Sequence, residues 1–102
     1  FERLIRANLA ARWGVADYAR ALAITPTHLS RLCRRTSGRP ASDWIARAGI
    51  TEACRALAYT DRGIARIAYD LGYDDPSHFS RVFRRRMGLS PTAYRQTVLQ
   101  RD

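Results

Sequence analysis

Three arginines recur at matched positions in two stretches of this chain, and arginine can donate paired hydrogen bonds to guanine or to phosphate. The two stretches are residues 25–38 and 75–88, and seven of their fourteen positions are identical. The identical pairs are Pro26/Pro76, His28/His78, Ser30/Ser80, Arg31/Arg81, Arg34/Arg84, Arg35/Arg85 and Gly38/Gly88. The repeat indicates two equivalent surfaces that suit a polyanion such as nucleic acid.

The place of each side chain in the repeat indicates which part of a DNA duplex it would contact. We expect Arg31 and Arg81 to donate to the O6 and N7 atoms of guanine. Short hydroxyl side chains on the same face would contact base edges, namely Thr27, Ser30, Ser77 and Ser80. The arginines further along are expected at phosphates, namely Arg34, Arg35, Arg84 and Arg85. The alternative for any one of these arginines is a solvated surface charge or a helix-end cation.

The two histidines, His28 and His78, are the remaining candidates for chemistry. A zinc or catalytic pair is conceivable from their number, but neither has a Cys, Asp or second His at ligand spacing. Packing or hydrogen bonding near a turn is the favoured interpretation, with a DNA contact as the second. The chain also lacks a glycine-rich phosphate loop, a nucleophile motif and paired carboxylates on one face. We therefore expect no enzyme activity, no catalytic residue, no metal and no cofactor.

The overall charge also favours a polyanionic partner. The chain has 18 basic and 9 acidic residues, a formal net charge of +9, and every basic residue is arginine. A GC-rich genome would produce the same preference for arginine. No run approaches the roughly 20 apolar residues of a membrane span, and no leader pattern is present, so we expect a cytoplasmic location. Cys33 and Cys54 are expected to be reduced and buried.

Helix start and stop signals frame each copy of the repeat. Thr25 and Asp75 suit the N-cap, the following prolines suit the first helical position, and Gly38 and Gly88 suit the end. Apolar residues at 29, 32 and 33, and again at 79, 82 and 83, predict one buried stripe on each helix. The capped helix starts would offer amide donors to phosphate.

A shorter helix is predicted upstream of each copy, over residues 15–22 and 64–71, which completes two helix-turn-helix units. Ala19 and Ala68 fall where the two helices of a unit would cross. Gly72 suits a left-handed cap, whereas Ala23 stands at the same point of the first copy and predicts a different turn there. The second turn is one residue longer.

The rest of the chain predicts helices that connect and cover these units. Residues 41–59 form one long helix whose apolar stripe changes face near Gly49, where close packing or bending would explain the glycine. Helices over residues 1–11 and 90–99 bring the total to about seven, with no strand. The expected organisation is all-α: a first homeodomain-like unit (1–39), a linker helix (40–60) and a second unit (61–102). Further interpretations are core or interface positions for Trp13 and Trp44, packing of the last helix by Tyr94, and surface charges at Arg86, Arg95 and Arg101.

Residues 64–95 resemble the signature of the AraC/XylS family of bacterial transcription activators, and the resemblance extends over nearly the whole chain. It implies seven helices in two helix-turn-helix subdomains, double-stranded DNA and RNA polymerase as partners, and an effector or dimerisation domain outside this chain. Gly49 departs from the basic or polar residue usual in the family. The first repeat is similar to regulators of aromatic-acid catabolism, which is a weak hint of an effector.

Other function classes predict different behaviour. An adaptor that contacts RNA polymerase would have only non-specific DNA affinity, supplied by its basic surface. A membrane-surface role would need an exposed apolar band opposite the basic faces, and the sequence lacks one. The resemblance favours activation and leaves repression open.

Overall fold

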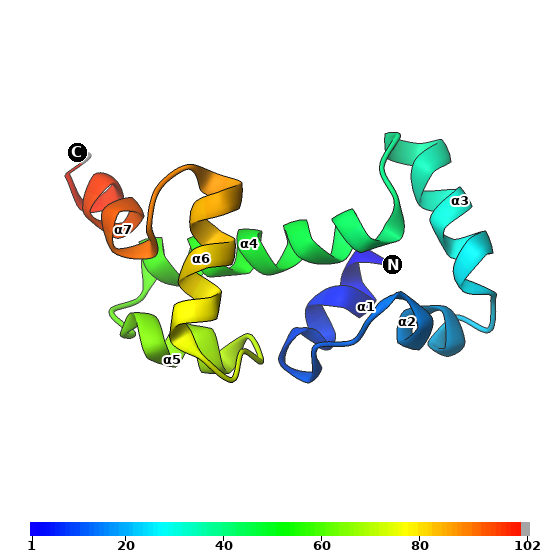
Figure 1. The fold of residues 1–102 in the computed structure, drawn as a ribbon, viewed down its shortest axis with the longest axis horizontal. Coiled ribbons are helices and arrows are strands. Elements are labelled where there is room, and N and C mark those ends of the chain that lie inside the picture. Colours follow the sequence, from blue (N-terminus) through cyan, green and yellow to red (C-terminus); the bar gives the residue numbers. More distant parts are fainter. Residues whose placement is uncertain (101–102) are drawn as a thin grey trace. The chain divides into compact units, whose positions relative to one another are not determined.

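The computed structural model describes residues 1–100, and these residues form helices joined by short turns (Figure 1). The helices are α1 (Glu2–Ala7), the short 3-10 helix η1 (Leu9–Ala11), α2 (Val15–Ala21), α3 (Pro26–Ser37), α4 (Ala41–Tyr59), α5 (Ile64–Asp70), α6 (Pro76–Met87) and α7 (Pro91–Leu99). Within residues 1–100 there is no strand, which confirms the predicted all-α class and the seven helices. The first helix is shorter than predicted, because Asn8 leaves the helical region at φ −123°.

The chain divides into two compact units, the first spanning Phe1–Gly49 and the second beginning at Ile50. Each unit contains one helix-turn-helix pair, α2 with α3 in the first and α5 with α6 in the second. Helix α4 begins in the first unit and ends in the second. A Cβ atom added at Gly49 would meet no atom within 4 Å, so close packing does not account for this glycine.

The first unit is built around a small core to which the Arg-bearing helix α3 contributes Leu29 and Cys33. Ala19 is fully buried, as expected for the crossing point of α2 and α3. The third member of the predicted stripe, Leu32, is 40% exposed. The prediction was wrong there because the buried side of α3 is narrow. Leu29 and Cys33, about one turn apart, lie in its middle, and Leu32 lies at its edge.

The second unit uses larger side chains at the matching positions. Phe79 and Phe83 replace Leu29 and Cys33 and are almost completely buried. Phe83 also packs edge-on against Tyr94 of α7, with ring centroids 5.7 Å apart. Such aromatic contacts add about 0.5–1.5 kcal/mol beyond the area that they bury. Tyr94 therefore fastens the last helix onto this unit, as the sequence predicted.

The two helix-turn-helix turns begin in the same backbone conformation in spite of their different side chains, although the second turn is one residue longer, as predicted. Ala23 has a φ of 59° and Gly72 a φ of 89°, both left-handed. In each turn the backbone amide of the next residue donates a hydrogen bond to the carbonyl of the buried alanine in the preceding helix. Ile24 donates to Ala19 and Tyr73 to Ala68, each at 3.0 Å. The expectation of a different first turn was wrong, because this hydrogen bond requires the left-handed residue whether or not it carries a Cβ.

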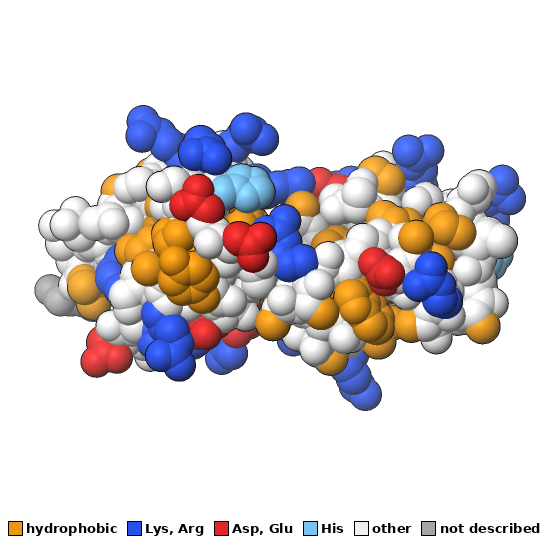
Figure 2. All heavy atoms as spheres, turned by 60° about the horizontal axis from the view of Figure 1, so that its bottom comes forward, with side chains coloured by type: hydrophobic (Ala, Val, Ile, Leu, Met, Phe, Trp, Pro, Cys, Tyr) orange, Lys and Arg blue, Asp and Glu red, His pale blue; other side chains and the backbone are white. Residues whose placement is uncertain are grey.

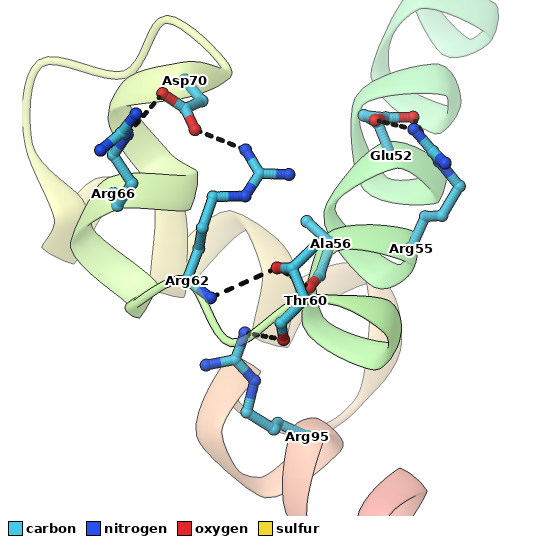
Figure 3. A network of polar contacts seen from close by, with 8 residues as sticks. All are labelled: Glu52, Arg55, Ala56, Thr60, Arg62, Arg66, Asp70 and Arg95. Carbon is cyan, nitrogen blue, oxygen red and sulfur yellow. Dashed lines mark hydrogen bonds and ion pairs between the residues drawn. The ribbon is translucent and has the colours of Figure 1, made fainter.

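The carboxyl end of α4 is held by Arg95 of α7 (Figure 3). Its Nε donates to the carbonyl of Leu57 at 3.1 Å and its Nη2 to that of Thr60 at 3.2 Å. The Thr60 hydroxyl donates to the carbonyl of Ala56 at 2.6 Å. The last carbonyls of a helix lack partners inside the helix, so these bonds satisfy them. Arg95 is thus a structural tie and not the surface charge expected. Arg86 is exposed, and Arg101 lies outside the described residues.

Replacing Ala23 by glycine should stabilise the protein. Glycine removes a left-handed strain of about 1–2 kcal/mol and costs about 0.4–1 kcal/mol in unfolded-chain entropy, so the net gain is roughly 0.5–1 kcal/mol. Urea unfolding of Ala23→Gly measures it, and Gly72→Ala should shift stability in the opposite direction. A loss of stability in Ala23→Gly would show that the Ala23 Cβ is not strained.

Replacing Arg95 by glutamine should destabilise the protein, because it leaves carbonyls of α4 without their charged donor. The expected loss is about 1–2 kcal/mol, the lower part of the range for hydrogen bonds to charged groups, because the site is partly exposed. Urea unfolding would measure the loss, with Gln96→Ala on the exposed face of the same helix as the control. Equal stabilities of Arg95→Gln and the control would show that the hydrogen bonds from Arg95 to α4 do not stabilise the protein.

Candidate nucleic-acid interface

The two Arg-bearing helices α3 and α6 begin and end in the same way. The Thr25 hydroxyl accepts from the backbone amide of His28 at 3.1 Å, and the Asp75 carboxylate accepts from that of Ser77 at 2.9 Å. Each helix has proline in its first turn and ends at a glycine with left-handed φ, 78° at Gly38 and 81° at Gly88. Both helices are therefore twelve residues long, with matching faces exposed.

Most of the predicted site residues are exposed on the face opposite the core. The exposed ones are Thr27, Arg31, Arg34, Arg35, Ser77, Arg81, Arg84 and Arg85. Ser30 and Ser80 are half-buried, because each follows directly after a buried core residue. A helix buries one side and presents the other, so burial of Leu29 and Phe79 orients the arginines outward. Each unit thus places its three repeated arginines in solvent.

The repeated arginines differ from most others in having no partner. Within residues 1–100, no ion pair or hydrogen bond engages the guanidinium of Arg31, Arg34, Arg35, Arg81, Arg84 or Arg85. Other arginines pair with acids, in Arg20–Asp17, Arg39–Asp43, Arg55–Glu52, Arg62–Asp70 and Arg66–Asp70. Figure 2 shows arginine side chains standing out from the surface in separate groups, some beside acidic side chains. The helices α3 and α6 thus carry cations available to a polyanion.

His78 and the two tryptophans contact neighbouring side chains. The ring of His78 stands edge-on to that of Tyr73, with centroids 5.3 Å apart, which confirms packing near the turn. His28 is exposed. Trp13 packs edge-on against Tyr18, and Trp44 donates from Nε1 to the hydroxyl of Ser37 at 2.8 Å. Residues 1–100 contain no group of three or more metal-binding side chains.

The cysteines are free thiols. Cys33 is buried as predicted, whereas Cys54 is only half-buried. Burial raises the pKa of both thiols above the ordinary value, and a hydrogen bond with Tyr94 partly offsets this at Cys54. A raised pKa keeps the thiol protonated and unreactive. Neither cysteine adds chemistry to the interface.

Helix α5 is anchored by a carboxylate shared between two arginines (Figure 3). The Asp70 Oδ2 atom lies 2.6 Å from Arg62 Nη1, and its Oδ1 lies 3.1 Å from Arg66 Nε. The hydrogen bond from Arg62, with a smaller contribution from Arg66, lowers the pKa of Asp70 below its ordinary value. Sequence reasoning missed this group, although acid and base four residues apart on a helix is a readable signal.

Two helix-turn-helix pairs, each with unpartnered arginines on its second helix, define a DNA-binding domain. The family model described as "Helix-turn-helix domain" matches residues 18–97. The chain belongs to the AraC/XylS family of transcription regulators, whose helix-turn-helix DNA-binding domain it contains. The family and its relatives are DNA-binding regulators and not enzymes.

Named relatives and solved structures agree with this assignment. The MmsAB operon regulatory protein of Pseudomonas aeruginosa is 35% identical over 94% of this chain and 31% of its own length. The HTH-type transcriptional activator AarP of Providencia stuartii is 33% identical over 89% of this chain and 67% of its own length. A DNA-binding transcriptional dual regulator from Escherichia coli is 28% identical, with a TM-score of 0.84 over 98% of this chain and 89% of that one.

A further solved structure holds DNA. The DNA-binding domain of AdpA, solved in complex with a target DNA, has a TM-score of 0.82 over 93% of this chain and 86% of that one. At 24% identity this likeness shows the fold. The chain spans only 31% and 32% of the first two curated relatives that it matches. No helix within residues 1–100 is long and apolar enough to cross a membrane.

Replacing Asp70 by asparagine should destabilise the protein near neutral pH, because two arginines lose their shared carboxylate. A lowered folded-state pKa means that the carboxylate stabilises the fold above its unfolded-state pKa. That contribution disappears as pH falls through the folded-state value. Urea midpoints of wild type and Asp70→Asn should therefore differ near neutrality and converge in strong acid.

The control is Asp61→Asn, which removes an exposed carboxylate that has no ion pair within the described residues. Asp61→Asn should change the urea midpoint little at either pH. A midpoint difference between wild type and Asp70→Asn that stays constant with pH would show that the charge of Asp70 is not what stabilises α5.

Proposed function

We propose that this domain binds double-stranded DNA with sequence specificity, and that α3 and α6 are its two recognition helices. The observation that carries the proposal is the set of six arginines that are exposed and have no partner within residues 1–100, at matched positions of two helix-turn-helix units. A helix fits the major groove, whose width and pattern of donors and acceptors allow bases to be distinguished. Two such helices on one chain would read two successive major grooves, about 34 Å apart along the duplex.

Each side chain of the interface has a proposed role. Arg31 and Arg81 donate to guanine O6 and N7. They lie in the first half of their helices, and the N-terminal part of a recognition helix is the part that contacts base edges. Short hydroxyl side chains allow close approach and add smaller contacts, namely Thr27, Ser30, Ser77 and Ser80. The arginines nearer the helix ends hold phosphates and set the register, namely Arg34, Arg35, Arg84 and Arg85. Half-burial of Ser30 and Ser80 limits them to contacts at the edge of the groove.

The intact protein is proposed to be a cytoplasmic transcription activator that contacts RNA polymerase. One supporting observation is that the relative from Providencia stuartii is named a transcriptional activator. The structural neighbour from Escherichia coli is a dual regulator, so repression by some members is compatible with the same domain. Because the first curated relatives are about three times as long as their match, an effector or dimerisation domain is also proposed.

Selection of duplexes from a randomised library, at two salt concentrations, tests the proposal directly. The expected result is one enriched motif with two blocks about ten base pairs apart, one for each recognition helix. Salt-sensitive binding without enrichment would overturn sequence-specific reading. It would favour the adaptor, whose basic surface supplies non-specific affinity alone.

Replacing Arg81 by alanine should cost about 1–3 kcal/mol of binding free energy on the selected duplex and much less on random DNA. The matched control is Arg84→Gln, one turn further along α6. It should weaken binding to both duplexes equally and lower the salt slope by roughly one. Fluorescence anisotropy titrations measure both variants. Equal losses on the two duplexes for Arg81→Ala would count against base contact by this residue.

A further inference from the structure

The two units carry unequal charge although they repeat the same fold. Residues 1–49 contain nine arginines and three acidic residues, whereas residues 50–102 contain nine arginines and six acidic residues. The formal net charge is therefore +6 on the first unit and +3 on the second. Nearby charge governs the sequence-independent part of DNA affinity. Equal folds thus offer DNA unequal electrostatic attraction.

The pairing of the arginines increases this difference. In the first unit six guanidinium groups have no partner within the described residues: Arg3, Arg6, Arg31, Arg34, Arg35 and Arg47. In the described part of the second unit three are free, namely Arg81, Arg84 and Arg85. The others there include Arg55, Arg62 and Arg66, each bonded to an acid, and Arg95, bonded to carbonyls. An arginine held by a carboxylate must break that ion pair before it can neutralise a phosphate.

The start of the recognition helix is the third difference, and it lies at the proposed interface. Helix α3 begins at the neutral cap Thr25, whereas α6 begins at Asp75, preceded by Asp74. Both aspartates are exposed, and the Asp74 carboxylate has no hydrogen bond or ion pair among residues 1–100. The start of a helix attracts phosphate through its free amides, and two carboxylates there repel it. The N-terminus of α3 therefore attracts phosphate more strongly than the N-terminus of α6.

We infer that the two units divide the work of binding: the first supplies most of the ionic affinity, and the second holds DNA only where its base contacts form. This inference rests on the proposed function and assigns Asp74 and Asp75 as residues that weaken the ionic attraction of the second unit for DNA. Repulsion acts on every sequence alike, so it lowers the affinity for random and cognate DNA by the same factor. The second unit therefore supplies less ionic affinity than the first, and a larger share of its binding comes from base contacts such as those of Arg81.

A swap of cap residues between the units tests this division in the full chain. Asp74→Asn with Asp75→Thr gives α6 a neutral cap like that of α3, and Thr25→Asp gives α3 an acidic one. Both Thr and Asp cap helices well, so both variants should keep the fold. Anisotropy titrations would use a random-sequence duplex and the selected duplex, with urea midpoints as a check on folding.

The neutral-cap variant should bind random DNA several-fold more tightly, about three-fold for each carboxylate removed, from the Coulomb energy of a charge near a phosphate. Its affinity for the selected duplex should rise by a similar factor, because the repulsion does not depend on sequence. Thr25→Asp should weaken binding to both duplexes. The control Asp61→Asn removes one carboxylate at an exposed site outside α6. Its effect on random DNA should be clearly smaller than the roughly three-fold effect expected for one carboxylate at the cap.

Two results would overturn the inference: an effect of the neutral-cap variant that is no larger, for each carboxylate removed, than that of Asp61→Asn, or an affinity for random DNA that Thr25→Asp leaves unchanged. Failure of the proposed function is recognised separately. In that case the wild type would prefer no sequence, while the measurements on random DNA would still report whether the acidic cap repels the duplex.

Discussion

Burial of one side of α3 and of one side of α6 is the constraint on which the rest of the candidate interface depends. Leu29 and Cys33 occupy it in α3, and Phe79 and Phe83 in α6. Each pair is four residues apart, about one turn, so it fixes the rotation of the helix about its own axis. Three arginines on the opposite side are then presented to solvent. The candidate interface is thus positioned by apolar packing, and its arginines stay available because no carboxylate within residues 1–100 pairs with them.

The two units reach this arrangement with different means. The first packs Trp13 and Trp44 against a small core, and the second fills the matching core positions with phenylalanines whose contacts continue into Tyr94. In the second unit several arginines bind to the protein itself. Arg95 donates to carbonyls at the end of α4, and two arginines bind Asp70. Because a guanidinium already bonded to the protein is less available to DNA, structure and binding compete for the same residue type in the second unit. The first unit has less of this competition.

Much of the fold could be predicted because the sequence states it twice. The bounds of α3 and α6 and the long α4 follow from caps, prolines and apolar spacing, and the structure confirms them. The predictions that were wrong depended on which side chains lie next to a residue in space, and spacing along the sequence does not give this. Leu32 has the right spacing for the stripe but lies beyond the line of contact. Arg95 looks like any other surface arginine until the end of α4 is placed beside it.

The proposed contacts of the interface rest on a different kind of inference. Exposure and the lack of partners within the described residues make Arg31 and Arg81 available, but these properties also describe Arg34 and Arg84. The sequence distinguishes them only by distance along the helix. The start of the helix approaches bases and the end approaches phosphates in a helix-turn-helix. Base and phosphate roles can therefore be separated only with DNA present.

The left-handed Ala23 has a consequence for how this domain has evolved. Every alanine codon becomes a glycine codon by one change at the second base, so an unstrained turn has always been a single mutation away. The second unit carries glycine at that point, and the first does not. Selection removes variants that fall below a threshold of stability and does not reward stability beyond it. The retained alanine indicates a first unit that folds well enough without that gain.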